Sequence, residues 1–122
     1  MDFEIPAKVK PIVNQLRAFL QEQIIPIEPA FLNGEFADLL PELAKVRERV
    51  RAAGLWAPHL PEQYGGLGLS LHEFAHVSEE LGRSPLGHYC FNCQAPDIAN
   101  MDLLLRYGTE EQKERFFEPL AR

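Results

Sequence analysis

The sequence of 122 residues predicts an all-α fold, an antiparallel bundle of about six helices with short connections. Apolar residues recur at three- and four-residue spacing in most segments, which indicates amphipathic helices. The prolines gather between these segments, where they interrupt helices least. Two segments begin with capping boxes, formed by Ser70 with Glu73 and by Thr109 with Gln112. No strand pattern competes with these signals.

The first helix is expected over residues 6–25. Its apolar face consists of Val9, Ile12, Val13, Leu16, Phe19, Leu20 and Ile24. Pro11 would lie in the first turns, where a missing backbone donor costs little. Pro26 and Pro29 would then end the helix, because proline cannot continue the hydrogen-bond ladder.

The second helix is expected over residues 38–53. Its apolar face consists of Leu39, Leu43, Val46 and Val50, and the charged residues from Lys45 to Arg51 occupy its other faces. Gly54 follows directly, and glycine is the usual residue just beyond a helix end.

Residues 55–69 are expected to form an ordered loop. Apolar side chains anchor it at Trp56, Leu60, Tyr64 and Leu67. Its glycines, Gly65, Gly66 and Gly68, lack both the preceding strand and the spacing of a phosphate-binding loop. We interpret them as turn residues.

The capping box at Ser70 opens a third helix that ends near Gly82. Its apolar side consists of Leu71, Phe74, Val77 and Leu81. Pro85 then leads into a fourth helix over residues 88–94.

Pro96 opens a fifth helix that runs through Tyr107. Gly108 is expected to end it with a positive φ angle, which glycine adopts without a steric penalty. Thr109 then opens the last helix.

Composition excludes several classes of function. The formal net charge is −6 and the basic residues are scattered, so the sequence lacks the basic stripe of a nucleic-acid-binding protein. No apolar run approaches the ~18 to 20 residues needed to cross a bilayer. The first residues resemble neither a secretory signal nor a transit peptide, so a cytoplasmic protein is expected.

A zinc hydrolase is one alternative, because His72, Glu73 and His76 fit the H-E-x-x-H pattern on a helix. Two histidines four residues apart could share a metal, with the glutamate as the base. The pattern needs a third ligand, however, and Glu79 and Gly82 occupy the positions where known extensions of the motif require glycine and histidine. Glu73 is also accounted for by the Ser70 capping box, so no metal site is predicted.

Cys90 and Cys93 form a C-x-x-C pair with no second pair and no βαβ pattern beside it. Two cysteines on an apolar segment are expected to be small core residues. No Asp or Glu is isolated within an apolar run, so the sequence nominates no general base, and no catalytic residue is predicted.

Three segments resemble the acyl-CoA dehydrogenase family. The segment from Ala95 to Lys113 contains Ala-Pro-Asp-x-x-Asn-Met and then Gly-Thr-x-x-Gln-Lys, and is most similar to the subgroup of family members ten and eleven. Residues 55–69 resemble the family's proline-rich turn into Tyr-Gly-Gly-x-Gly. Residues 79–84, Glu-Glu-Leu-Gly-Arg-Ser, resemble the end of the helix that follows.

This resemblance implies that residues 1–122 are the amino-terminal helical domain of a larger enzyme. Such an enzyme removes the α-proton of an acyl-CoA with a glutamate while the β-hydride passes to FAD. The middle β-domain and the carboxy-terminal helical domain, which supply the flavin site and the base, are absent from the chain. We therefore expect the chain alone to hold no FAD and to be non-catalytic.

The resemblance also implies one wall of the acyl pocket. Ungapped alignment backward from Gly108 puts Phe91, Asn92, Ala95, Pro96 and Ala99 at the wall positions. Small residues there would leave room for a long or bulky acyl chain. The same residues could instead serve only in helix packing.

A stand-alone helical interaction module that has lost the chemistry is the other alternative. In either case Met101, Leu103, Leu104, Leu105 and Trp56 cannot all be covered by a bundle of this size. The isolated chain is therefore expected to form a homodimer or a higher oligomer that buries the face meant for the missing domains.

Overall fold

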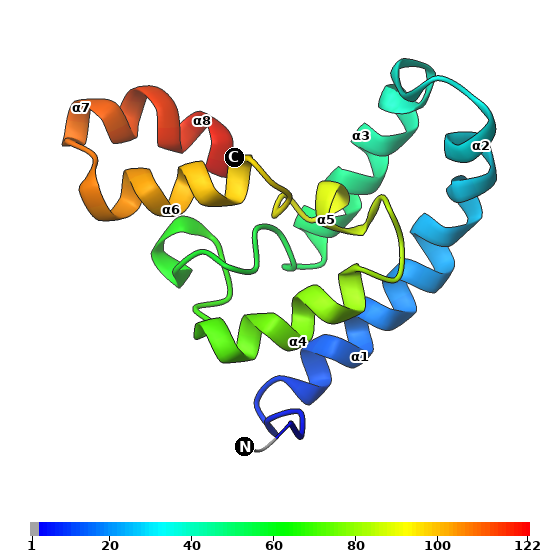
Figure 1. The fold of residues 1–122 in the computed structure, drawn as a ribbon, viewed down its shortest axis with the longest axis horizontal. Coiled ribbons are helices and arrows are strands. Elements are labelled where there is room, and N and C mark those ends of the chain that lie inside the picture. Colours follow the sequence, from blue (N-terminus) through cyan, green and yellow to red (C-terminus); the bar gives the residue numbers. More distant parts are fainter. Residues whose placement is uncertain (1–2) are drawn as a thin grey trace.

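The computed structural model describes residues 3–122, which are helical with no strand in that range, so the predicted all-α fold is confirmed (Figure 1). The α-helices are α1 (Lys10–Phe19), α2 (Glu28–Asn33), α3 (Phe36–Ala52), α4 (Leu71–Leu81), α5 (Gly87–Cys90), α6 (Asp97–Tyr107), α7 (Glu110–Gln112) and α8 (Glu118–Ala121). Single turns of π-helix span Leu20–Ile24 and Lys113–Phe117, and 3-10 turns span Ile25–Ile27 and Glu62–Tyr64. Within residues 3–122, no helix has the length and apolar character needed to traverse a bilayer.

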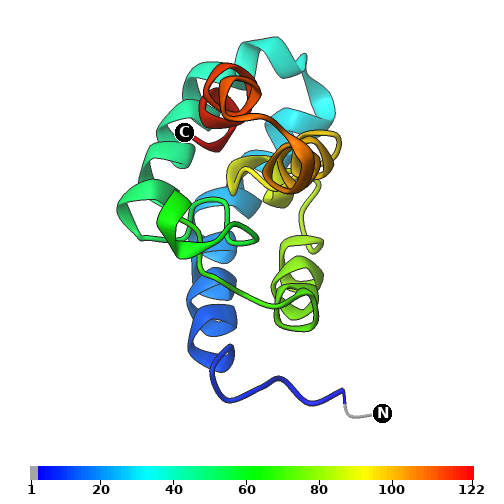
Figure 2. The same ribbon diagram turned by 90° about the vertical axis from the view of Figure 1, so that its left-hand side faces the viewer.

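Two helical pairs organise the molecule. Helix α4 packs against α1, and α6 packs against the C-terminal helical segment of residues 110–121. Figure 1 shows that second pair as a hairpin at the end of the molecule away from α2, and Figure 2 shows the N-terminal segment leaving the far end of α1. The loop between α3 and α4 and the short α5 lie between the two pairs (Figure 1).

The core is built from the faces that the periodicity indicates. Val13, Leu16, Leu20 and Ile24 of the first helix are buried, and so are Leu39, Leu43, Val46 and Val50 of α3. The loop contributes Trp56 and Leu60. Burial of these apolar side chains is the main force that holds the helices together.

The first helix begins later than predicted and ends at Ile24, just before Pro26, as expected, but the chain then forms further helical segments. Pro11 lies in the first turn of α1, as expected. Pro26 and Pro29 each stand at the start of the next helical segment, so the chain turns through Ile25–Ile27 and continues as α2. Proline is tolerated at these positions, because the backbone N–H that it lacks would have no hydrogen-bond partner in the first turn of a helix.

The predicted helix over residues 88–94 is also wrong in length, since α5 ends at Cys90. Asn92 has a φ of 57°, a left-handed conformation that asparagine tolerates better than most residues, and it breaks the helical path. Phe91 and Cys93 are nevertheless buried, in a turn instead of a helix. The apolar residues that suggested a helix here are buried for another reason, because they lie in a buried turn.

Two details of the later helices differ from expectation. Leu71 is expected on the apolar side of its helix, yet its side chain is 85% exposed. It occupies the first position of α4, just after the Ser70 cap. Gly108 has a φ of −71°, not a positive angle. A glycine is needed at position 108 for another reason, since a Cβ there would lie 2.5 Å from the carbonyl oxygen of Leu104.

Both capping boxes are confirmed. The Ser70 hydroxyl accepts from the backbone of Glu73, and the Glu73 carboxylate accepts from the backbone of Ser70. Thr109 and Gln112 make the same reciprocal pair. Each box satisfies two backbone donors that would otherwise lack a partner.

Candidate functional site

The five residues predicted for an acyl wall lie at the start of α6 and just before it. Ala95, Pro96 and Ala99 are exposed, and together they present a surface of small side chains. Phe91 and Asn92 are buried, at 0% and 6% exposure. The structure thus separates the set into three exposed residues and two buried ones.

Phe91 and Asn92 belong to a tight turn over residues 89–93, called here the 89–93 turn. The backbone of Asn92 donates to the carbonyl of Tyr89, and that of Cys93 donates to the carbonyl of His88. The ring of Phe91 meets Phe19 of α1 edge to face, with 5.5 Å between centroids. The turn is therefore anchored both by its own backbone and by packing on α1.

A backbone hydrogen bond from the loop residue Ala57 also holds the 89–93 turn. The backbone N–H of Ala57 donates a 2.9 Å hydrogen bond to the carbonyl of Phe91. Ala57 itself has a φ of 44°, a left-handed angle that is costly for a residue with a Cβ. Such angles persist only where the surrounding structure holds them.

Arg47 of α3 reaches into this region and was not singled out by the sequence. Its guanidinium lies 4.6 Å from the ring centroid of Trp56 and 4.6 Å from that of Tyr89. It also donates to the carbonyl of Tyr89 and to the side-chain oxygen of Asn92. Burial lowers the pKa of this guanidinium from its usual value.

The C-terminal helix is tied to the same region. The Asn92 side-chain amide donates to the carbonyl of Leu120 at 2.8 Å. The Trp56 indole donates to the carbonyl of Ala121 at 2.9 Å. Residues from three distant parts of the sequence therefore meet around the 89–93 turn.

Of the predicted wall residues, Ala99 lines a groove of about 380 Å³. Ala99 and Ile98 come from α6, and Leu69, Leu71 and Phe74 come from the start of α4 and the residues before it. Asp102 and Arg106, paired at 2.8 Å, also line it. The groove is thus mainly apolar in its lining side chains.

His59 also lines this groove, and no pattern in the sequence singled it out. Neither ring nitrogen has a hydrogen-bond partner, although both are buried. The ring packs against Phe74, with 5.9 Å between centroids. Burial lowers its pKa from 6.5 to about 4, so the imidazole is neutral at physiological pH.

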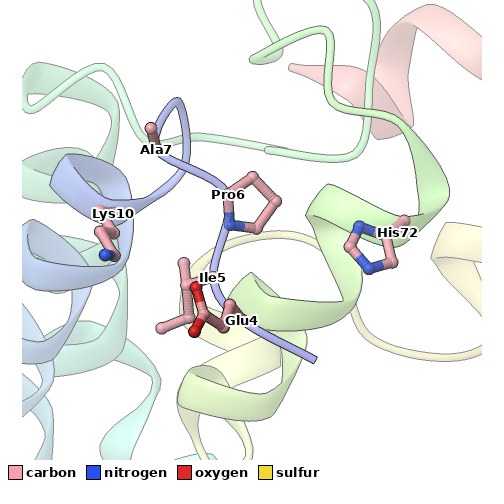
Figure 3. Close-up of a pocket in the computed structure, with 6 residues that line it drawn as sticks. All are labelled: Glu4, Ile5, Pro6, Ala7, Lys10 and His72. Atoms are coloured by element: carbon pink, nitrogen blue, oxygen red, sulfur yellow. The ribbon is translucent and has the colours of Figure 1, made fainter. Parts of the chain in front are cut away.

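The H-E-x-x-H segment has other partners in the structure. Glu73 is engaged by the Ser70 cap and by Lys8, whose ammonium lies 3.4 Å from the carboxylate. The rings of His72 and His76 contact each other edge to face. Figure 3 shows His72 beside a hollow of about 430 Å³ that is otherwise lined by the N-terminal segment and Lys10. Over residues 3–122, no three His, Cys, Asp or Glu side chains are grouped to hold a metal.

Cys90 and Cys93 are core residues, as predicted. They are 0% and 2% exposed, and neither forms a disulfide. Burial raises the pKa of each thiol to about 12, which keeps both protonated. They are therefore poor nucleophiles and poor metal ligands in the folded chain.

Glu80 is a buried carboxylate that the sequence did not reveal. Arg17 of α1 donates to both of its oxygens, at 3.1 and 3.0 Å, and Arg83 donates at 2.6 Å. The hydrogen bond from Arg17, helped by Arg83, lowers the pKa of Glu80. A carboxylate held ionised in this way suits a structural ion pair better than a general base with a raised pKa.

Comparison with known proteins identifies close similarities. The model of the family described as "Acyl-CoA dehydrogenase, N-terminal domain" matches residues 7–122. Acyl-CoA dehydrogenase family member 10 of Mus musculus is 37% identical over 121 residues, which is 92% of this chain and 11% of that protein. Family member 11 of Homo sapiens is 33% identical over 121 residues, which is 93% of this chain and 15% of that protein.

A solved structure gives the same result. The structure of a candidate acyl-CoA dehydrogenase from Mycobacterium abscessus superposes with a TM-score of 0.86 at 39% sequence identity. The match covers 98% of this chain and 32% of that one. The chain therefore spans about a third of the solved relative and a smaller share of the curated ones.

Proposed function

Since the chain belongs to the acyl-CoA dehydrogenase family through its N-terminal domain, we propose that it forms one wall of the acyl pocket in an FAD-dependent enzyme. That enzyme would convert an acyl-CoA thioester into its α,β-unsaturated product. Residues 1–122 would be its amino-terminal helical domain. A middle β-domain and a carboxy-terminal helical domain would provide the remaining parts, including the flavin site and the base.

The observation that carries this proposal is the surface at the start of α6. Ala95, Pro96 and Ala99 are exposed there, and their small side chains leave space in front of them. Ala99 also lines an apolar groove with Ile98, Leu69 and Phe74. A hydrocarbon chain needs such a surface, because binding removes its apolar area from water.

The glycine turn at residues 65–68 does not fit the pyrophosphate of FAD. A pyrophosphate is usually held by glycines at the start of a helix. This turn is closed by its own chain, since a Cβ on Gly66 would lie 2.0 Å from the carbonyl oxygen of Leu60. We therefore expect other domains to hold the flavin.

The other candidate function is an interaction module, and the exposed apolar face of α6 and the C-terminal helix is the feature on which the two candidates differ. Leu103, Tyr107 and Phe116 are 58%, 78% and 49% exposed. Leu103, Leu104 and Phe116 line an apolar groove of about 560 Å³ between α6 and the C-terminal helix. Met101, in contrast, is buried, and Leu104 and Leu105 are partly covered. An apolar face of this kind needs a partner, which would be another domain of the enzyme or a second copy of the chain.

An enzyme assay tests the proposal in a polypeptide that joins this chain to a middle β-domain and a carboxy-terminal helical domain, called here the longer enzyme. Purified protein is mixed with saturated acyl-CoAs of graded length, and reduction of an electron acceptor is followed together with formation of the 2-enoyl product. We expect turnover that depends on chain length. If no acyl-CoA of any length gives product while the protein is folded and loaded with flavin, the proposal is wrong and the interaction module is favoured.

A further inference from the structure

We propose that Arg47 is a positioning residue for the acyl wall. From α3 it holds the 89–93 turn, which contains Phe91 and Asn92 and leads along the chain into Ala95. The inference rests on the proposed function for its consequence in catalysis. The geometric part, that Arg47 fixes the turn, is independent of any substrate.

The first support is the stacked arrangement of three side chains. The Arg47 guanidinium lies at 4.6 Å from the Trp56 centroid and at 4.6 Å from the Tyr89 centroid. Two aromatic rings therefore contact one planar cation. Tyr89 is the first residue of the turn, so stacking against Arg47 fixes where the turn begins.

The second support is the set of hydrogen bonds that Arg47 makes within the turn. One guanidinium nitrogen donates to the carbonyl of Tyr89 and the other to the side chain of Asn92, at 3.5 Å. Asn92 is in turn bonded to the C-terminal helix, because its side-chain amide donates to the carbonyl of Leu120. Arg47 thus connects α3, the 89–93 turn and the C-terminal helix.

The third support is the backbone conformation that these contacts hold. Among residues 3–122, the non-glycine residues with positive φ are Ala57 and Asn92. They lie on the two sides of Phe91, because Ala57 donates to the Phe91 carbonyl and Asn92 follows it in sequence. Both angles cost free energy and need contacts from outside the segment. Arg47 supplies such a contact directly to Asn92.

Lysine could not replace Arg47 in this role. An ammonium group is a point charge, whereas the guanidinium is planar, stacks on rings and donates from a rigid fork. Arg51 offers a matched control on the same helix. It stacks on Trp56 at 3.6 Å, but its hydrogen bonds go to Glu48 and to the backbone of Arg122 instead of to the turn.

Hydrogen exchange of the chain tests the positioning. In Arg47→Met we expect the amides of Asn92, Cys93 and Ala57 to exchange at least ~10-fold faster than in the parent, because local opening becomes easier. In Arg51→Met the same amides should stay within ~2-fold of the parent. Equal effects of the two substitutions at these amides would overturn the inference. If Arg47→Met does not fold, Arg47→Lys takes its place, with the same expectation.

The consequence for the acyl wall is tested in the longer enzyme. The ratio kcat/KM is measured across acyl-CoA lengths for the parent, Arg47→Lys and Arg51→Lys. We expect Arg47→Lys to change the preference between short and long chains by ~5-fold or more, and Arg51→Lys to leave the preference unchanged. A purely structural role would lower activity evenly across lengths, and that result would overturn the catalytic part of the inference.

The two failures can be told apart. A parent enzyme that turns over no acyl-CoA contradicts the proposed function and, with it, any effect of Arg47 on chain length. The exchange experiment still decides whether Arg47 holds the turn. An active parent with parallel Arg47→Lys and Arg51→Lys profiles contradicts this inference and leaves the proposed function in place.

Discussion

The indole nitrogen of Trp56 donates a 2.9 Å hydrogen bond to the carbonyl oxygen of Ala121, 65 residues further along the chain. This contact fastens the loop after α3 to the last turn of the C-terminal helix. It also explains why Trp56 is only 7% exposed, since Arg51 covers the ring from another side. The predicted incomplete coverage of the apolar set is confirmed at Leu103, whereas Trp56 is covered within the domain.

Trp56→Phe should destabilise the chain by about 1 to 2 kcal/mol. The substitution removes a buried hydrogen bond and leaves the Ala121 carbonyl without its partner. Urea unfolding followed by circular dichroism measures the change, because Trp56 is the single tryptophan and its fluorescence would be lost. Tyr107→Phe, at an exposed position of α6, is the control and should change stability by less than ~0.5 kcal/mol. Equal stabilities of the two variants would show that the indole contact contributes nothing.

Glu80→Gln should destabilise the fold by about 1 to 3 kcal/mol at neutral pH, because two arginines lose their buried partner. The pKa of Glu80 is lowered in the folded state, mainly by the Arg17 hydrogen bond. Its contribution is therefore complete at neutral pH and is lost as pH falls through the folded pKa, below the usual carboxylate range.

Denaturant unfolding at a series of pH values measures this effect. Glu79→Gln changes a neighbouring exposed carboxylate and should follow the parent curve. The interpretation fails if Glu80→Gln has the same stability as Glu79→Gln at pH 7.

His59 should titrate near pH 4, because burial lowers its pKa from 6.5. The unfolded chain binds the proton at higher pH than the folded chain, so stability should fall as pH drops from about 6.5 toward 4. The loss should be about 2 kcal/mol after allowance for the part of the ring that solvent screens. Proton NMR of the histidine rings measures the pKa directly, with His59→Gln used to assign the signal. A pKa above 6 would show that the ring is solvated.

The chain should self-associate through the face that carries Leu103 and Phe116. Leu103→Lys places a charge on that face and should shift the molecule toward the monomer, because the charge would be buried in the contact. Light scattering at several concentrations measures the change. Leu32→Lys alters an even more exposed leucine on α2 and should leave the assembly as in the parent. A parent that stays monomeric at high concentration and binds no hydrophobic dye would favour a finished stand-alone module.

Sequence patterns predicted the fold well where one mechanism decides the structure. The apolar spacing of α3 correctly predicted its four buried residues, because a helix buries one face at a fixed period. The capping boxes at Ser70 and Thr109 placed two helix starts, since the reciprocal hydrogen bonds involve only residues three apart.

The remaining features depend on contacts between distant residues. Arg47 has the sequence appearance of a solvated charge, and only the fold brings Trp56 and Tyr89 to its two sides. The same holds for His59, whose burial depends on α4 and α6. The wall residues were predicted by family resemblance alone, and the left-handed turn at Asn92, which ends the helix before Phe91, is not encoded in the apolar spacing.

The most direct test of the acyl wall is the chain-length preference of Ala99→Phe in the longer enzyme. Ala30→Phe makes the same change at an exposed position of α2, away from the wall, and serves as the control. If Ala99 lines the pocket, the phenyl ring occupies space needed by the acyl chain. We then expect kcat/KM for long acyl-CoAs to fall by ~10-fold or more, with short ones within ~3-fold of the parent. A profile that matches that of Ala30→Phe at every length would contradict the proposal that this surface forms the wall.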